Sequence, residues 1–452
     1  MTFRLSEFAE IVGGKCLRDG EFSDFCIDSR KGKSGDLFVC LKGARVDGHD
    51  FIGKAAENGV SALLIDHQVD SDLPRVLVPD TLKALQDFAA WYRTRPDLKV
   101  VAVTGSVGKT TTKEFISAVL SQSVPTYKTQ GNMNSETGLP LTLLHVEPSH
   151  KAVVTEMGMC NFGEISELSL IARPDVGVLT NIGMCHIEYL GSQEGILKAK
   201  MEIVDGMSDD GILVINGDDP FLSTVTETKQ RRVTYGLNHP DYDYYAYNVA
   251  VLSEGVRFTA KTPLGDLDVV LAIDGIHNVY NALAAIAVGV IFGMSLADIG
   301  EGLRRMEKAP MRQNIRKENG MTLIEDCYNA SPTSMKASID VLKGKTGRKI
   351  AVLGDMLELG ENSEEYHKQV GNLLEGVSVL IAYGDFAEAY LAGASEAGVL
   401  QRIPCRTPEE AAVNLKLVAR QDDVILFKAS RGMHAERVIE YFLNDKKEQE
   451  DI

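Results

Sequence analysis

Residues 103–112 combine the residue types that bind the phosphate groups of a nucleotide. They read V-T-G-S-V-G-K-T-T-T, and glycines at such a turn let backbone N–H groups approach phosphate oxygens at the start of a helix. The lysine can reach the β- and γ-phosphates, and the threonine after it is a natural Mg²⁺ ligand. A standard phosphate loop has glycine where this chain has Val103, so the loop is a variant form. The predicted nucleotide-binding residues are Gly105, Ser106, Val107, Gly108, Lys109, Thr110 and Thr111.

Polar side chains also follow two apolar segments further along the chain. Glu156 comes directly after V-V-T (153–155), and Asn181 and His186 follow residues 176–180. A carboxylate at the carboxyl end of a parallel strand, beside a phosphate loop, is placed to hold Mg²⁺ directly or through water. His186 taken alone is more typical of a hydrogen-bonded structural histidine, because Mg²⁺ prefers oxygen ligands.

Two lysines, Lys198 and Lys200, lie in a helical pattern just after this region. On their own they are more typical of a solvated basic face than of a reaction centre. The local residues therefore predict a nucleotide site but leave its use open. Kinases, GTPase switches and transport ATPases all share a phosphate loop.

The elements that must position these residues alternate between strands and helices. Buried-strand patterns occupy residues 100–104, 152–155, 176–180 and 212–215. Helical patterns separate them, which predicts a parallel sheet covered on both faces. Residues 244–273 alternate in the manner of an antiparallel appendage, and the Ala- and Val-rich helix at 278–292 closes the segment.

A length of 452 residues predicts roughly three domains. We place them at residues 1–97, 98–310 and 311–452, with residues 94–98 as the first linker. The third repeats the strand–helix rhythm and predicts a small doubly wound sheet. The predicted fold class is α/β, with a small α/β N-terminal domain, a central parallel-sheet ATPase domain and a C-terminal Rossmann-like domain. Strand patterns in the third domain lie at 322–324, 349–353, 379–382 and 424–427.

Composition excludes several classes of protein. A net charge of −17 argues against general affinity for nucleic acid or an anionic membrane. The start of the chain lacks the apolar core of a signal peptide, and no apolar run is long enough to span a bilayer. Seven scattered cysteines without a C-x-x-C pair argue against a disulfide framework or a thiolate zinc site. We therefore expect a cytoplasmic protein without membrane insertion, and nothing demands more than a monomer.

Longer strings accompany the phosphate loop almost from end to end, and together they resemble the Mur ligase superfamily. The strings are D-S-R (28–30), G-D-L-F (35–38), D-G-H-D-F-I (47–52), G-N-M-N (131–134), E-M-G-M (156–159), T-N-I-G (180–183), G-I-H-N-V-Y-N (275–281), D-C-Y-N-A-S-P (326–332), L-G-D-M-L-E-L-G (353–360) and K-A-S-R (428–431). The phosphate loop alone marks only the superfamily. The D-S-R, Y-N-A-S-P and G-D-M-L-E-L-G strings favour the step of cell-wall precursor synthesis that adds D-Ala-D-Ala to UDP-N-acetylmuramoyl-tripeptide.

The resemblance also implies roles for individual residues. Lys109, Glu156, His186 and Lys200 become catalytic candidates: Glu156 and His186 help to hold a second Mg²⁺ besides the ion at Thr110, and Lys200 aligns with a lysine that the family carbamylates. Contacts with ATP are implied for Asn278, Asn281, Arg312 and Asp326. Substrate contacts are implied for Ser29, Arg30, Asp47, Asn132, Asn134, Asn181, Tyr328 and Asn329.

The expected reaction makes an amide from a carboxylate and an amine. Transfer of the γ-phosphoryl group of ATP turns the carboxylate into a mixed anhydride with a good leaving group, which the free amine can attack. A folylpolyglutamate-synthetase-like ligase shares the loop and the lysine, but the strings of the first domain disfavour it. A nucleotide switch without ligation leaves Glu156, His186 and Lys200 unexplained, and a kinase would leave the phosphate on its product.

Overall fold

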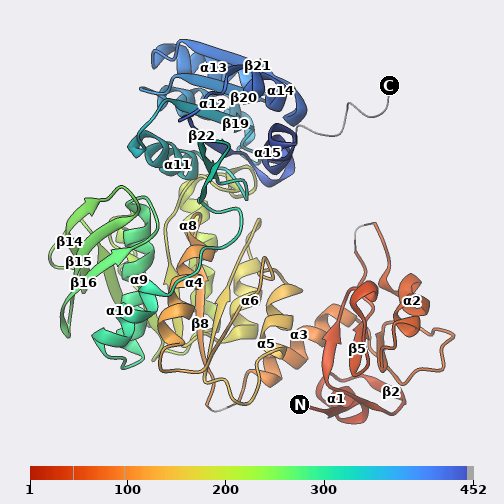
Figure 1. Ribbon diagram of the computed structural model, residues 1–452. Helices are drawn as coiled ribbons and strands as arrows, with labels where there is room; N and C mark the ends of the chain where they lie inside the picture. Colours follow the sequence, from red (N-terminus) through yellow and green to blue (C-terminus); the bar gives the residue numbers. More distant parts are fainter. Residues whose placement is uncertain (44, 96, 445–452) are drawn as a thin grey trace, which may run out of the picture.

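The computed structural model describes residues 1–43, 45–95 and 97–444, and its sheets divide the chain into three parts (Figure 1). In this view the N-terminal part lies to the right of the central part, and the C-terminal part lies above the central part. This arrangement confirms the predicted α/β class. Residue 96 of the predicted linker and residues 445–452 lie outside the described residues, and the domain boundaries themselves stay predictions. No described helix has both the length and the apolar character needed to cross a membrane.

The N-terminal part is built on a small mixed sheet of order β2-β7-β6-β5-β4, in which only β2 is antiparallel to its neighbour. Its strands are β2 (Lys15–Arg18), β4 (Asp24–Cys26), β5 (Asp36–Val39), β6 (Ala62–Ile65) and β7 (Arg75–Leu77), with a separate pair β1 (Phe3–Arg4) and β3 (Glu21–Phe22). The helices are α1 (Leu5–Ile11), α2 (Ile52–Glu57) and α3 (Thr81–Tyr92), and the 3-10 turns are η1 (Ser29–Lys31) and η2 (Gly48–Phe51). A cluster of aromatic rings, including Phe8, Phe22 and Phe88, fills its core.

The central part is one sheet of order β16-β15-β14-β13-β12-β11-β8-β10-β9. The strands are β8 (Lys99–Thr104), β9 (Thr126–Lys128), β10 (Ala152–Glu156), β11 (Val176–Leu179), β12 (Ile212–Asn216), β13 (Arg231–Gly236), β14 (Tyr244–Val251), β15 (Val256–Thr262) and β16 (Gly265–Leu271). The helices are α4 (Lys109–Leu120), α5 (Gly138–Leu144), α6 (Glu164–Ala172), α7 (Ile187–Leu190), α8 (Gln193–Met201), α9 (His277–Ile291) and α10 (Leu296–Arg304). β8 lies between β11 and β10, so the loops that follow these three strands meet at one edge.

The predicted antiparallel appendage is continuous with this sheet. β14, β15 and β16 pair antiparallel with one another, but β14 also pairs parallel with β13 through Tyr235–Tyr244 and Gly236–Tyr245. Helix α9 packs between this extension and α4, and residues 282–288 are fully buried. An uninterrupted Ala/Val/Ile/Leu segment suits a helix that is covered on every side.

The C-terminal part is a doubly wound sheet of order β17-β18-β22-β19-β20-β21, parallel except for β17. The strands are β17 (Asn314–Glu318), β18 (Met321–Glu325), β19 (Lys349–Gly354), β20 (Val379–Tyr383), β21 (Gln401–Cys405) and β22 (Val424–Lys428). The helices are α11 (Pro332–Gly344), α12 (Ser363–Asn372), α13 (Ala387–Glu396), α14 (Pro408–Val418) and α15 (Ala435–Leu443). The Rossmann-like prediction for this part is therefore confirmed.

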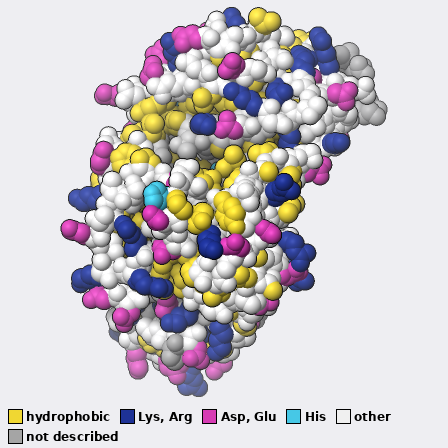
Figure 2. Space-filling model, turned by 90° about the vertical axis from the view of Figure 1, so that its left-hand side faces the viewer, with side chains coloured by type: hydrophobic (Ala, Val, Ile, Leu, Met, Phe, Trp, Pro, Cys, Tyr) yellow, Lys and Arg dark blue, Asp and Glu magenta, His cyan; other side chains and the backbone are white. Residues whose placement is uncertain are grey.

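The surface carries both signs of charge. On the face drawn in Figure 2, basic and acidic side chains of the described residues are interspersed, and hydrophobic side chains gather where the C-terminal part meets the rest.

Candidate active site

The phosphate loop follows β8 and leads directly into α4, as its sequence predicts. Gly108 has φ of 89° at the N-cap of α4, a left-handed conformation that favours glycine. The Lys109 Nζ donates to the carbonyl oxygen of Gly105 at 2.8 Å. Burial lowers the pKa of Lys109, because a charged ammonium loses hydration there. Nucleotide phosphates would supply the negative charge that this ammonium needs.

Asn181 holds the loop in shape from the neighbouring strand end. Its Oδ1 accepts from the Val107 N–H and its Nδ2 donates to the Val107 carbonyl, both at 2.9 Å. The Thr180 hydroxyl donates to the same carbonyl at 2.6 Å. Asn181, predicted as a substrate contact, therefore uses its amide on the loop itself while it lines the cavity described below.

Glu156 ends β10 and lies beside the first turn of α4. Its Oε2 accepts from the Thr110 hydroxyl and its Oε1 from the Asn134 amide, both at 2.9 Å. The buried Lys113 Nζ lies 3.9 Å from Oε2. These contacts bring a hydroxyl and a carboxylate together, and both are oxygen ligands of the kind that a hard divalent cation prefers.

Lys200 is buried, whereas Lys198 on the same helix is exposed. The solvated face that the local pattern favoured is thus correct for Lys198 and wrong for Lys200. Burial, reinforced by the nearby charge of Lys109, lowers the pKa of Lys200 to about 7. Among the residues that the structure describes, none accepts a hydrogen bond from its Nζ. Far more of this amine is therefore neutral and nucleophilic near pH 7 than for an exposed lysine.

Asn278 and Asn281 stand in the first turns of α9 and face the loop. Asn281 accepts from the Thr112 hydroxyl at 3.0 Å and donates to Asn278 Oδ1 at 3.0 Å. A Cβ added to Gly108 would lie 2.9 Å from Asn281 Oδ1, so the loop and the helix approach closely. Asn278 in turn donates to the Asp274 carbonyl at 2.7 Å.

The C-terminal part contributes a charged pair at the ends of β18 and β22. Lys428 Nζ lies 2.6 Å from Asp326 Oδ2, which also accepts from the Ser338 hydroxyl. Burial alone would raise the pKa of Asp326, but the attraction of Lys428 outweighs it and lowers the pKa. Beside this pair the Arg312 guanidinium stacks 4.0 Å from the centre of the Tyr328 ring.

One cavity of about 650 Å³ joins these groups across the central and C-terminal parts. The predicted residues that line it are Ser106, Val107, Gly108, Lys109, Thr111, Asn134, Glu156, Asn181, His186, Asn278, Asn281, Arg312, Asp326, Tyr328 and Asn329. Thr110 lies behind this surface in contact with Glu156. The remaining predicted residues are outside its lining: Gly105, Asn132, Lys200, Ser29, Arg30 and Asp47.

Comparisons with known proteins agree with this geometry. Residues 22–93 match the Mur ligase family catalytic domain, residues 103–289 the Mur ligase middle domain, and residues 304–431 the glutamate ligase domain of Mur ligases. The chain is 41% identical to the UDP-N-acetylmuramoyl-tripeptide--D-alanyl-D-alanine ligase of Bacillus subtilis, over 96% of this chain and 97% of that protein. The chain belongs to the Mur ligase family.

Solved Mur ligase structures have the same three-part fold. MurF from Acinetobacter baumannii superposes with a TM-score of 0.91 at 33% identity, covering 98% of this chain and 99% of that one. MurF from Thermotoga maritima, solved in complex with ADP, gives a TM-score of 0.81 at 33% identity, with 93% and 96% covered. The resemblance first recognised in the sequence strings is therefore confirmed.

In this Mur ligase, His186 meets a residue of the C-terminal part. Its Nδ1 lies 2.5 Å from Glu358 Oε2 as an ion-pair contact without hydrogen-bond geometry, and this contact lowers the pKa of Glu358. Both residues have left-handed backbone conformations, with φ of 59° and 63°, which cost about 1 kcal/mol or more for a residue with a Cβ. A carboxylate beside one ring nitrogen is common around metal-binding histidines.

The N-terminal candidates of this Mur ligase have simpler surroundings. Arg30 is 82% exposed in its side chain and pairs with Asp28 at 2.9 Å. Ser29 is buried in η1, and Asp47 caps η2 by accepting from the His49 N–H at 3.0 Å. They lie on the substrate-binding part assigned by sequence, away from the lining of the large cavity.

Two residues of the site, Lys428 and Glu358, lie in family strings that imply no individual role for them. The signal at Lys428 is a lysine that ends an otherwise apolar strand pattern. Glu358 sits in a string as well, but its partner His186 is far away in sequence. No local pattern predicts a contact of that kind.

Proposed function

We propose that this Mur ligase joins the tripeptide carboxylate of UDP-N-acetylmuramoyl-tripeptide to the amino group of D-Ala-D-Ala, using ATP. The products are UDP-N-acetylmuramoyl-pentapeptide, ADP and phosphate. The observation that carries the proposal is the shared cavity, which places the phosphate loop opposite Arg312, Asp326 and Lys428 of the C-terminal part. The names of the relatives and the ADP complex of the Thermotoga protein support it.

The chain's own groups account for the phosphoryl-transfer half of the reaction. The loop N–H groups and Lys109 hold the β- and γ-phosphates, and Asn278 and Asn281 lie where the base of ATP would enter. The tripeptide carboxylate attacks the γ-phosphorus, the bond to the ADP oxygen breaks, and an acyl phosphate forms. Positioning and neutralisation of charge supply most of the rate enhancement in such a step.

Amide formation completes the cycle. The free amine of D-Ala-D-Ala attacks the acyl carbon, the tetrahedral intermediate releases phosphate, and the nitrogen loses its proton. Arg312 and the Asp326–Lys428 pair come from the C-terminal part, so both halves must close over the anhydride to exclude water. We assign Asn132, Asn134, Tyr328 and Asn329 to peptide contacts, and Ser29, Arg30 and Asp47 to the uridine diphosphate.

We propose that the site holds two Mg²⁺ ions. Glu156 and Thr110 offer oxygens beside the phosphate loop, and His186 lines the same cavity beside Glu358. Magnesium bound there supplies neutralisation of phosphate charge. The two ions stay a proposal, and so does the assignment of Thr110, Glu156 and His186 as their ligands.

We also propose that Lys200 is carbamylated. Its amine is buried, its pKa is about 7, and no described residue balances its charge. Addition of CO₂ to the neutral amine, with loss of a proton, gives a carboxylate-like group near Lys109. A ¹³C carbamate resonance after incubation with labelled bicarbonate would support the modification, and its absence from Lys200→Ala would assign it. An unlabelled wild type would contradict it.

The decisive experiment measures phosphate release and nucleotide-peptide mass together. Purified protein receives ATP, Mg²⁺ and UDP-N-acetylmuramoyl-tripeptide, with and without D-Ala-D-Ala, using both the lysine and the diaminopimelate tripeptides. Phosphate release that depends on the dipeptide, with a matching gain in mass, is expected. Phosphate release indifferent to both co-substrates would favour the nucleotide switch instead, and phosphate retained on the peptide would favour a kinase.

A folylpolyglutamate-synthetase-like activity has weaker support. The folylpolyglutamate synthase of Mycobacterium tuberculosis matches at 16% identity and a TM-score of 0.64, which indicates a shared fold only. For the protein as a whole we propose a cytoplasmic monomer with domain boundaries near residues 97 and 310. Light scattering would test the monomer, and limited proteolysis would test the boundaries.

A further inference from the structure

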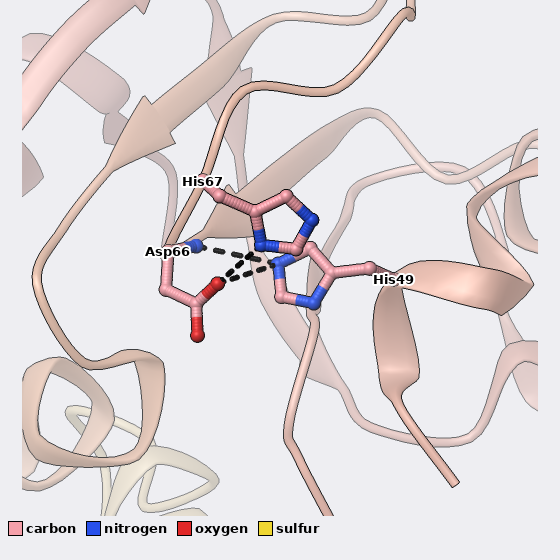
Figure 3. Close-up of side chains that lie close together, drawn as sticks. All are labelled: His49, Asp66 and His67. Atoms are coloured by element: carbon pink, nitrogen blue, oxygen red, sulfur yellow. Dashed lines mark hydrogen bonds and ion pairs between the residues drawn. The ribbon is translucent and has the colours of Figure 1, made fainter.

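A compact group of metal-binding side chains lies in the N-terminal part, away from the large cavity. His49 comes from η2, and Asp66 and His67 directly follow β6 (Figure 3). One ligand atom of each residue lies within 4.8 Å of the others. Figure 3 shows both imidazole rings converging on the Asp66 carboxylate. The two rings pack with their centres 4.1 Å apart.

The His49 ring is fixed in the orientation that metal binding needs. Its side chain is only 5% exposed, and its Nδ1 lies 2.6 Å from Asp47 Oδ1. The Asp66 backbone N–H donates to its Nε2 at 3.3 Å, which assigns the ring proton to Nδ1. Nε2 also lies 3.5 Å from Asp66 Oδ1, so a bound ion would replace this long N–H contact and bridge the two atoms. A carboxylate behind the distal nitrogen is the usual support of a metal-ligating histidine.

The two oxygens of the Asp66 carboxylate have different neighbours, and only Oδ1 lies close to both imidazole rings. Its Oδ2 pairs with Lys42 at 2.8 Å, while Oδ1 lies 2.6 Å from His67 Nδ1. Two carboxylates, Asp47 and Asp66, thus stand against this one lysine around the histidine rings, a balance that favours a cation.

We propose that His49 Nε2, Asp66 Oδ1 and His67 Nδ1 bind a divalent transition metal of the zinc class. Two imidazoles and one carboxylate suit Zn²⁺, Co²⁺ or Ni²⁺ and not Mg²⁺, which prefers oxygen. Tetrahedral ligands around zinc lie about 3.4 Å apart, close to the 3.5 Å between His49 Nε2 and Asp66 Oδ1. The contact between His67 Nδ1 and Asp66 Oδ1 is shorter than this spacing. The His67 side chain is 51% exposed, so its ring can move away from Asp66 to make room for the ion, and water would complete the coordination.

A bound ion would fasten η2 to the end of β6. Asp47, which caps η2 and is assigned to the nucleotide substrate, also supports His49. The ion would therefore fix a substrate-binding turn without taking part in phosphoryl transfer. The proposal does not depend on the ligase reaction.

Zinc titration of the full chain tests the site. Protein stripped with EDTA and saturated with Mg²⁺ is titrated with Zn²⁺ by calorimetry, and with Co²⁺ by visible absorbance. His67→Ala removes an exposed ligand, and Asp47→Asn removes the support of His49. His239→Ala is the matched control, because His239 is also exposed and lies 3.5 Å from a single carboxylate, Asp241. His186→Ala removes the imidazole that lines the large cavity, and so tests whether zinc binds there instead.

Wild type, His239→Ala and His186→Ala should each bind one Zn²⁺ with the same affinity. His67→Ala and Asp47→Asn should bind it about 10- to 100-fold more weakly, and the Co²⁺ spectrum of an imidazole-bound ion should fade in both. Zinc affinity unchanged in His67→Ala would overturn the proposal. So would a tight ion that disappears only in His186→Ala, or the absence of tight binding in wild type.

Discussion

The two regions assigned to substrates differ in how their charged groups are held. Lys109 and Glu156 line the large cavity and Lys200 is buried near Lys109, so their charges depend on ligands or on one another. In the N-terminal part, Arg30 is largely exposed and already paired with Asp28. Enclosed charges change reactivity because water no longer screens them, whereas exposed charges change affinity. The chemistry and the recognition should therefore be separable by mutation.

The largest effect is expected for Lys109→Met. Loss of the ammonium beside the transferring phosphate should lower kcat by about 10³-fold or more. Dipeptide-dependent phosphate release measures it. Lys83→Met, which removes an exposed lysine paired with Asp87, is the control and should keep its activity. A much smaller fall in kcat for Lys109→Met would show that Lys109 does not contact the transferred phosphate.

Lys200→Ala should lower kcat by about 10²-fold, since the proposed carbamate would support the proposed metals. Lys198→Ala, two residues away on the exposed face of α8, should behave as wild type. Added acetate should restore part of the rate to Lys200→Ala only, because it can stand in for the missing carboxylate. Equal losses in both variants would indicate damage to α8 rather than to the site.

Arg30→Ala should raise the KM for the nucleotide substrate about 10-fold, with kcat unchanged, as expected when a contact is made equally in ground and transition states. Its stability should stay within about 0.5 kcal/mol of wild type, because exposed ion pairs contribute little. Steady-state kinetics and urea unfolding measure the two quantities. A fall in kcat would contradict the separation of the two regions.

The last prediction concerns stability and its dependence on pH. The Lys200 pKa is about 7 in the folded protein, against an ordinary value of 10.5. Between these values the unfolded chain holds the extra proton, so stability should rise with pH, by at most about 1.4 kcal/mol per pH unit. Unfolding in CO₂-free buffer at pH 7 and pH 9, compared with Lys200→Met, isolates this contribution. Equal slopes in both proteins would show that Lys200 is charged when folded.

Much of the fold was predictable because its signals are local. The strand at 100–104 and the helix after it became β8 and α4, and Ala-rich residues 278–292 became α9. The loop and Glu156 were placed correctly relative to each other, because ends of neighbouring parallel strands must meet at one edge. The parallel pairing of β13 and β14 was not predictable from alternation, which says nothing of which neighbour a strand finds.

The unpredicted parts of the site come from contacts between distant segments. The burial of Lys200 depends on what packs over α8, while the sequence shows only two lysines two residues apart. His49 meets Asp66 and His67 because η2 folds back on β6, and the cysteine pattern had argued only against thiolate zinc sites. Contacts between such distant side chains depend on the tertiary fold, and they produce no periodic pattern in the sequence.

The contact between His186 and Glu358 joins the central part to the C-terminal part. Under the proposed role of His186 as a metal ligand, this contact would couple metal binding to the relative arrangement of the two parts. Free-energy coupling is reciprocal: if the closed arrangement strengthens Mg²⁺ binding, Mg²⁺ must favour that arrangement by the same factor. A magnesium titration followed by small-angle scattering would then report the interdomain equilibrium, and Glu358→Gln would weaken the link from both directions.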